Sequence, residues 1–237
     1  MVPDAYGQQH YLTGKDWDSL DSQIRQFKKS GFFITSLSSC DSGYACIVSK
    51  VPDWNHETVR TSWAANLKTG ERDLDTNKPL VNLFFKDKMA IEYSYEGTGI
   101  AKQYLFSFDT FFSVVQAYKE EIRSSGYIIS GLDRFDDKIF ITVSYGPAYN
   151  QFLNEAILFL NLPEKSCEIP YIEGMITTEF LFYLNKTLTV YTKHGMFSEE
   201  TAIINPSQQH IKDLKGEGYS LSLVRGIEDV FIVYFVR

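Results

Sequence analysis

The chain of 237 residues has 44% hydrophobic and 15% aromatic residues, so it can bury a substantial core and is not expected to be disordered. Its formal net charge of −7 and the lack of any Lys and Arg cluster argue against a nucleic-acid partner, because binding to phosphates needs clustered cations. Cys40, Cys46 and Cys167 form no CxxC pair, so neither a disulfide framework nor a zinc site is expected.

The first residues have neither the basic start nor the apolar stretch of a secretory signal, and no segment is apolar enough to cross a bilayer. We therefore expect a cytoplasmic protein with no membrane partner. No Pro/Ser/Gly-rich tract or block of like charge divides the chain, which indicates one domain over residues 1–237.

In chain order, a short strand around Tyr11 and Leu12 and a helix from Asp16 to Lys29 precede a hairpin that begins at Gly31. The hairpin has two strands rich in β-branched and aromatic residues, joined by a turn with Asp and Gly, which is the pattern of a β-hairpin. Similar hairpins are predicted to begin near residues 78, 126, 174 and 218.

Two further helices are predicted between the hairpins. One begins with Asp109 as its N-cap and ends before Gly126. The other has Asn205 as its N-cap and Pro206 at its first position, and ends before Gly218. Glycines that follow a helix in this way favour the left-handed backbone conformation that ends it.

The hairpins recur at a nearly constant interval. Equivalent first-strand positions are separated by steps of 47, 48, 47 and 45 residues; they are Ile34, Val81, Ile129, Ile176 and Leu221. Regular spacing of this kind is typical of repeat architectures. We therefore predict a mainly β protein with short helices, built from five units.

The two ends of the chain indicate how the units are arranged. The fifth hairpin ends at Arg237 with no strand after it, whereas residues 1–30 hold a strand and a helix with no hairpin before them. This predicts that residues 1–30 complete the last unit and close a five-bladed β-propeller-like toroid without an open sheet edge. An open solenoid would need polar capping repeats, which neither end resembles. A two-domain α+β arrangement is the remaining alternative.

The turns after two hairpins carry a shared pattern. Residues 144–151 (SYGPAYNQ) and 95–103 (YEGTGIAKQ) resemble the S-K-G-T-G-Y-x-x-Q turn of a tandem repeat found C-terminal to the kinase domain of plant casein-kinase-1-like kinases. Residues 29–35 (KSGFFIT) are similar to the start of that repeat. The resemblance implies a helix, hairpin and strand in each unit and an interaction or regulatory role. It implies no kinase activity and no catalytic residue, because this chain lacks the kinase motifs.

A Pro-x-aromatic-Asn turn recurs two units apart, at residues 52–55 and 147–150. Aromatic faces flanked by amides suit a sugar or a peptide, so these turns hold the candidate ligand-binding residues Trp54, Asn55, Tyr149 and Asn150. The structural alternative is that Pro and Asn shape the turn while the ring covers the edge of the sheet, and repeat proteins favour that alternative.

The sequence predicts no catalytic residue, metal or cofactor. Gly97-x-Gly99 lacks the rest of a Walker or Rossmann fingerprint, and the four histidines have no partner at zinc-ligand or catalytic spacing. Cys46 alternates within an apolar strand and is predicted to be a core residue. The acidic run from Asp133 to Asp137 could bind a cation, although a solvated hairpin tip explains it more simply.

Three functions therefore remain open. The first is a non-catalytic interaction or scaffold module of the WD40-like kind, which holds a protein partner on one face of the ring. The second is a small-molecule or glycan binder with lectin-like pockets near Trp54 and Tyr149. The third is an enzyme in the central channel, where distant residues would meet. Two perturbed carboxylates or a Cys–His pair at the channel mouth would favour the enzyme.

Overall fold

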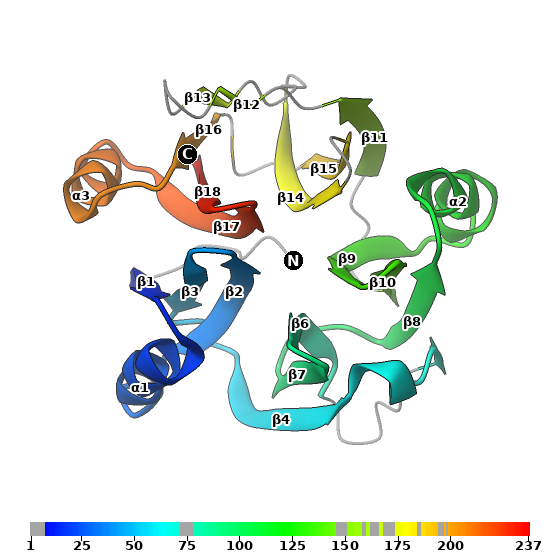
Figure 1. Cartoon of the computed structure of the whole chain (residues 1–237), viewed down its shortest axis with the longest axis horizontal. Helices are drawn as coiled ribbons and strands as arrows, with labels where there is room; N and C mark the ends of the chain where they lie inside the picture. Colours follow the sequence, from blue (N-terminus) through cyan, green and yellow to red (C-terminus); the bar gives the residue numbers. More distant parts are fainter. Residues whose placement is uncertain are drawn as a thin grey trace.

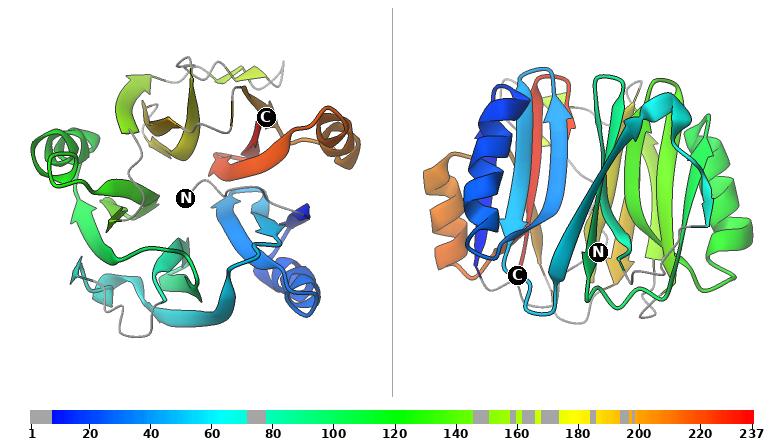
Figure 2. Two further views of the ribbon diagram at one scale, coloured as in Figure 1. Left: turned by 180° about the vertical axis from the view of Figure 1, so that it is seen from behind. Right: turned by 90° about the horizontal axis from the view of Figure 1, so that it is seen from below.

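The computed structural model describes residues 8–71, 78–145, 151–157, 160–161, 166–167, 174–183, 186–193, 197 and 199–237. Over these residues the chain is mainly β, as predicted, with short helices and five main antiparallel sheets of three or four strands. Figure 1 shows these sheets in a ring around a common centre. Seen from the side, the strands run along the axis of the ring (Figure 2).

Each main sheet has an outer, a middle and an inner strand, and the outer strand comes first in the chain. The outer strands are β1 (Gln9–Gly14), β4 (Asn55–Trp63), β8 (Lys102–Phe108), β11 (Gln151–Ile157) and β16 (Glu200–Ile204). The inner strands are β2 (Phe33–Cys40), β6 (Leu80–Lys86), β9 (Ile128–Phe135), β14 (Met175–Tyr183) and β17 (Ser220–Ile227). The middle strands are β3 (Gly43–Ser49), β7 (Met89–Glu96), β10 (Lys138–Tyr145), β15 (Lys186–Lys193) and β18 (Val230–Val236).

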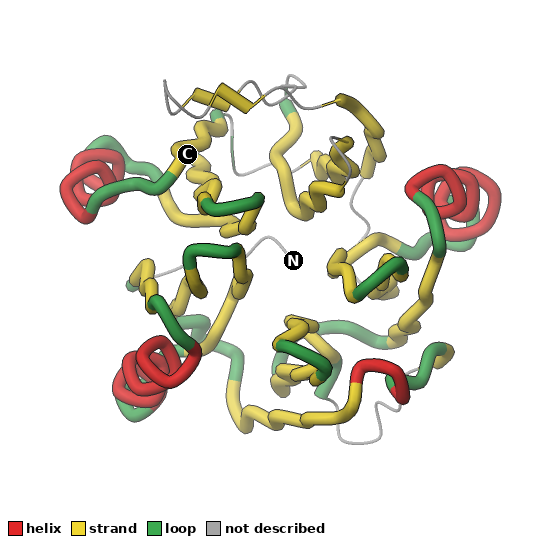
Figure 3. Tube along the Cα trace, viewed as in Figure 1, coloured by secondary structure: helices red, strands yellow, loops and turns green. Residues whose placement is uncertain are grey.

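The connections between outer and inner strands differ from unit to unit. Helices lie on the outside of the ring in the first, third and fifth units (Figure 3); they are α1 (Trp17–Lys28), α2 (Phe111–Ala117), which continues into a π-helical turn (Tyr118–Ile122), and α3 (Gln208–Gly216). The connection in the second unit holds a 3₁₀ turn (Ala64–Asn66) and β5 (Gly70–Glu71), which pairs with β8. The connection in the fourth unit holds the paired strands β12 (Leu160–Asn161) and β13 (Ser166–Cys167). None of the helices in the described ranges has both the length and the apolar character needed to cross a membrane.

The helix ends follow local capping chemistry. Gly126 and Gly218 have φ angles of 77° and 92°, so the predicted left-handed conformation is confirmed. The predicted N-caps are wrong by one and two residues. Thr110 caps α2 by accepting a hydrogen bond from the Ser113 nitrogen, and Ser207 caps α3. Asp109 and Asn205 lie just outside the helices, because the cap must be the extended residue whose side chain reaches the first turn.

The prediction that residues 1–30 complete the last unit is wrong. β1 pairs with β3, from Gln9 opposite Ser49 to Gly14 opposite Tyr44, so the N-terminal strand and helix belong to the first unit. The C-terminal hairpin takes its outer strand from β16, which precedes it in the chain. Periodicity shows the length of a repeat but not whether the outer strand comes before or after its hairpin, because strand pairing is not local.

The first and last units meet through side chains. The inner strands contact one another in the order β2, β6, β9, β14 and β17, and β17 contacts β2. Between β17 and β2, the backbone nitrogen of Val224 donates to Ser36 Oγ at 3.0 Å, and that of Gly226 donates to Ser38 Oγ at 2.9 Å. Serine hydroxyls thus take the place of backbone acceptors where two sheets come closest.

Every inner strand has a one-residue bulge near its start, where its register with the middle strand shifts. The extra residues are Thr35, Val81, Ser130, Thr178 and Ser222. Four of them carry a hydroxyl, and each hydroxyl donates to a carbonyl of the middle strand at 3.2–3.4 Å. A bulge re-aims the side chains that follow it, so these positions decide which residues face the axis.

Glutamines of two outer strands, β1 and β8, each fasten the bulge region of one unit to the next unit. Gln9 Oε1 accepts from the Leu221 nitrogen and Gln9 Nε2 donates to the Leu221 oxygen, both at 2.8 Å. Gln103 makes the same pair of hydrogen bonds with Leu80, again at 2.8 Å. Gln103 is the last residue of the S-K-G-T-G-Y-x-x-Q-like turn, so in this chain that residue joins neighbouring units.

Apolar side chains fill the spaces between neighbouring sheets. One cluster joins the first two units, another joins the third and fourth, and two more surround the last unit. All seven residues of β18 are buried. Cys46 is fully buried, which confirms its prediction as a core residue, and burial raises the pKa of its thiol well above the usual range.

Candidate functional site

Of the predicted ligand-binding residues, Trp54 and Asn55 do not line the pocket on the ring axis that is described below. Trp54 is 8% exposed; its ring stacks on Tyr95, with centroids 4.9 Å apart, and meets the edge of Phe33. These contacts place the ring in the apolar cluster that joins the first two units. Asn55 is exposed at the start of β4, opposite Glu96. Tyr149 and Asn150 lie outside the described residues.

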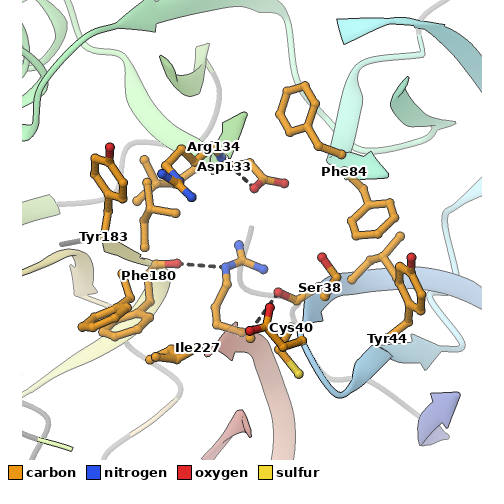
Figure 4. Close-up of a pocket in the computed structure, with 18 of the residues that line it drawn as sticks. Ser38, Cys40, Tyr44, Phe84, Asp133, Arg134, Phe180, Tyr183 and Ile227 are labelled. Atoms are coloured by element: carbon orange, nitrogen blue, oxygen red, sulfur yellow. Dashed lines mark hydrogen bonds between the residues drawn. The ribbon is translucent and has the colours of Figure 1, made fainter. Parts of the chain in front are cut away.

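Side chains from all five units meet in a pocket of about 450 Å³ on the ring axis, which we call the central pocket. It lies where the inner strands end, and the turns after β2, β6 and β17 form part of its rim. The strand segments that line it are Leu37–Cys40, Phe84–Lys86, Leu132–Arg134, Phe180–Tyr183 and Arg225–Ile227. In Figure 4, Asp133, Arg134 and Tyr183 approach from one side, and Ser38, Cys40 and Tyr44 from the opposite side.

Arg225 lines both the central pocket and a small cavity of about 20 Å³, and we call its position the floor of the central pocket. Its Nε donates to the Phe180 oxygen and its Nη1 to the Val224 oxygen, both at 3.0 Å, while Nη2 makes an ion pair with Glu179. The Nε contact is one of the dashed lines in Figure 4. The side chains of Arg225 and Glu179 are only 14% and 8% exposed. Since a buried ion pair adds little net stability compared with apolar packing, its clear effect here is to hold the guanidinium in one orientation.

Asp133 lies half-buried on the wall of the pocket, on β9. Burial raises the pKa of its carboxyl to about 7, with a smaller contribution from the negative charge of Glu179; Arg225 and the hydrogen bond from the Arg134 nitrogen act in the opposite direction. That bond, to Oδ1, measures 2.7 Å. Near neutral pH, the Asp133 carboxyl is therefore present in both ionised and protonated forms, so it can accept or donate a hydrogen bond.

Aromatic side chains complete the walls. The Arg134 guanidinium lies over the Tyr183 ring, 4.0 Å from its centroid, which is a cation–π contact. Phe85 stacks on Phe135 with centroids 5.3 Å apart, and Tyr44 meets the edge of Phe84 at 6.0 Å. The pocket thus combines fixed polar groups with apolar surface, as ligand sites do.

Sequence reasoning missed the main residues of this site. The acidic run was interpreted as a solvated tip, which fits the exposed Asp136 and Asp137 but not Asp133. Glu179 and Arg225 interrupt strands that otherwise hold apolar and hydroxyl side chains. The charge at these two strand positions is the sequence signal that could have identified them, because a charged residue is rarely buried without a partner.

We also searched the described residues for metal-binding clusters and for a nucleophile near the pocket. They include no cluster of three or more His, Cys, Asp or Glu side chains that could hold a metal ion. Cys40 reaches the central pocket, and its Sγ lies 3.0 Å from Ser42 Oγ. No histidine lines the described walls of the pocket, so no Cys–His pair is formed there.

No protein-family model matches the chain, and a comparison with curated proteins finds no match either.

Proposed function

We propose that the chain is a five-bladed β-propeller-like ring that binds a small polar molecule in its central pocket. Five similar sheets around one axis (Figure 1), with inner strands in contact from unit to unit, support the ring. Propellers use this arrangement to leave only short, protected sheet edges.

One observation carries the binding function: an immobilised guanidinium and a carboxyl that can both accept and donate face the same pocket. Arg225 and Asp133 come from the fifth and third units, and the pocket volume of about 450 Å³ falls within the range of small-molecule sites, about 300–1,000 Å³. Convergence of polar groups from separate units, with a shifted pKa among them, is a common mark of a functional site.

The binding function is tested by ligand-observed NMR with a library of small polar molecules. We expect at least one compound to bind the wild-type chain and to bind Asp133→Asn more weakly. Asp136→Asn is the matched control, because Asp136 undergoes the same chemical change on the exposed turn of the same hairpin. Equal binding to wild type and Asp133→Asn, or binding by no compound, would contradict the proposal.

Catalysis is not part of this proposal. The enzyme hypothesis called for two perturbed carboxylates or a Cys–His pair at the channel mouth. Asp133 supplies one such carboxylate, and no histidine of the described residues lines the central pocket to pair with Cys40.

A second function, binding of a protein partner, is favoured by strand β4. This outer strand pairs with β7, and no other strand of the described residues pairs with its free edge. Val59 and Trp63 of β4 are 46% and 58% exposed. Free edges and exposed aromatic side chains are features of protein-binding surfaces.

The test of this second function is affinity purification of the tagged chain with three forms compared: wild type, Trp63→Ser and Phe112→Ser. Phe112 is the control, since it is 69% exposed but lies on helix α2. We expect a partner that is lost with Trp63→Ser and kept with Phe112→Ser. A partner kept by all three forms would show that β4 is not the binding surface.

A further inference from the structure

The charges around the central pocket disfavour an ionic ligand. Among the described residues, its lining holds three cations, Lys86, Arg134 and Arg225, and four carboxyl groups, those of Asp41, Asp87, Asp133 and Glu228. Glu179 lies beside the floor, paired with Arg225. Each cation already has a neighbour: Lys86 lies over the Trp17 ring, Arg134 over Tyr183, and Arg225 is paired with Glu179. Because the carboxyl groups outnumber the cations, an anion would meet a net negative surface, and a cation would face the guanidinium of Arg225.

Hydrogen-bonding groups remain for a neutral ligand. A guanidinium has five N–H donors, and the three contacts of Arg225 leave one donor on each Nη atom. In the described part of the chain, the Asp133 carboxyl makes one hydrogen bond, at Oδ1, so Oδ2 is left to accept another. Fixed donors and a fixed acceptor facing one space match neighbouring hydroxyl groups, because each hydroxyl both donates and accepts.

The walls supply flat apolar surface beside these polar groups. Tyr44, Phe85, Phe182 and Tyr183 are half-buried where they line the central pocket. Aromatic rings of this kind pack against the C–H face of a ring-shaped ligand while its edge makes hydrogen bonds. A small aliphatic acid or amine would leave much of this surface without contact.

We infer that the ligand of the central pocket is a neutral sugar, held through adjacent hydroxyls between Arg225 and Asp133 and packed against the aromatic walls. This inference rests on the proposed binding function and specifies its ligand class.

The experiment is isothermal titration of the full chain with three probe sets: methyl glycosides of glucose, galactose, mannose and xylose; the uronates of glucose and galactose; and uracil as a planar amide. We expect one or more neutral glycosides to bind, and the matching uronate to bind more weakly. Loss of one hydrogen bond to a charged group should lower the affinity of Asp133→Asn about tenfold or more, whereas Asp136→Asn should bind as wild type does. Circular dichroism of both variants checks that they fold.

The outcomes separate this inference from the function on which it rests. If a uronate or uracil binds in an Asp133-dependent manner and no neutral glycoside does, the sugar class is wrong and the binding function stands. If glycosides bind equally well to wild type and Asp133→Asn, the sugar site lies elsewhere and the inference fails. If none of the probes binds, the inference fails, and the wider library tests the binding function independently.

Discussion

The carboxyl of Glu200 accepts two hydrogen bonds from Thr177, one from its backbone nitrogen at 2.7 Å and one from its hydroxyl at 2.9 Å. Thr177 precedes the bulge of β14, so Glu200 fastens the fourth unit to the fifth. Gln9 and Gln103 do the same elsewhere in the ring with amides, which can donate as well as accept. Glu200 therefore places an acid where other units have an amide.

Replacing this acid with an amide should stabilise the fold at neutral and higher pH. Burial raises the pKa of Glu200 from 4.5 to about 7, so the stability contributed by its protonated form is present below about pH 4.5 and lost as the pH rises through about 7. At about 1.4 kcal/mol per pKa unit, Glu200→Gln should gain at most about 3 kcal/mol at about pH 8 and much less at about pH 4. Urea unfolding at both pH values measures the difference.

The control for Glu200→Gln is Glu121→Gln, which makes the same change at an exposed position of the third unit. Its stability should stay within about 0.5 kcal/mol of wild type at both pH values. A Glu200→Gln variant that is less stable than wild type at about pH 8 would show that the carboxylate itself holds the two units together.

Adding a methyl group at Gly226 should disturb the contact between the first and last units. A Cβ atom there would lie 1.9 Å from the Ser39 oxygen, so β17 would have to move away from β2 and lose the hydrogen bond to Ser38. We expect Gly226→Ala to lower the free energy of unfolding by about 3 kcal/mol. Gly216→Ala, at the end of α3 with no atom within 4 Å of the added Cβ, should be neutral or slightly stabilising. Equal thermal stability of the two variants would contradict this prediction.

Breaking the ion pair at the pocket floor should cost more than removing it entirely. Arg225→Met leaves the Glu179 carboxylate buried without its partner, which typically destabilises a protein by about 3–5 kcal/mol. The double variant Arg225→Met/Glu179→Met removes both charges and should recover much of that loss. Urea unfolding of the two single variants and the double variant measures the coupling, and additive effects would show that the two side chains act independently.

Ligand affinity at the central pocket should fall as the pH drops below about 7. Asp133 faces Arg225 of β17, Glu179 of β14 and the neighbouring Arg134, and burial raises the pKa of its carboxyl to about 7. Protonation replaces the charged carboxylate with a neutral carboxyl, which is a weaker acceptor, so the affinity should fall by at most about tenfold for each pH unit well below that value. Titrations across this range check the profile, and Asp133→Asn should abolish the dependence. An affinity that rises as the pH falls would mean that the protonated form binds the ligand.

Local patterns in the sequence were enough to predict the mainly β class, the hairpins and the spacing of the units. Alternation of side chains, turn residues and the glycines at 126 and 218 act within a few residues, so their effects can be read without knowing what packs where. The same reasoning misplaced residues 1–30, because the partner of an outer strand is chosen across tens of residues of chain.

The central pocket depended on tertiary structure. Asp133, Glu179 and Arg225 lie in three different units, and a single extra residue in each inner strand changes which later side chains face the axis. Trp54 looked like a ligand residue in the sequence, and in the fold its ring packs against Tyr95 of the second unit and Phe33 of the first. The sequence by itself determined which local elements form and how often they recur. Only the folded chain decided which side chains share the axis, because that depends on bulges and contacts between units that no local pattern records.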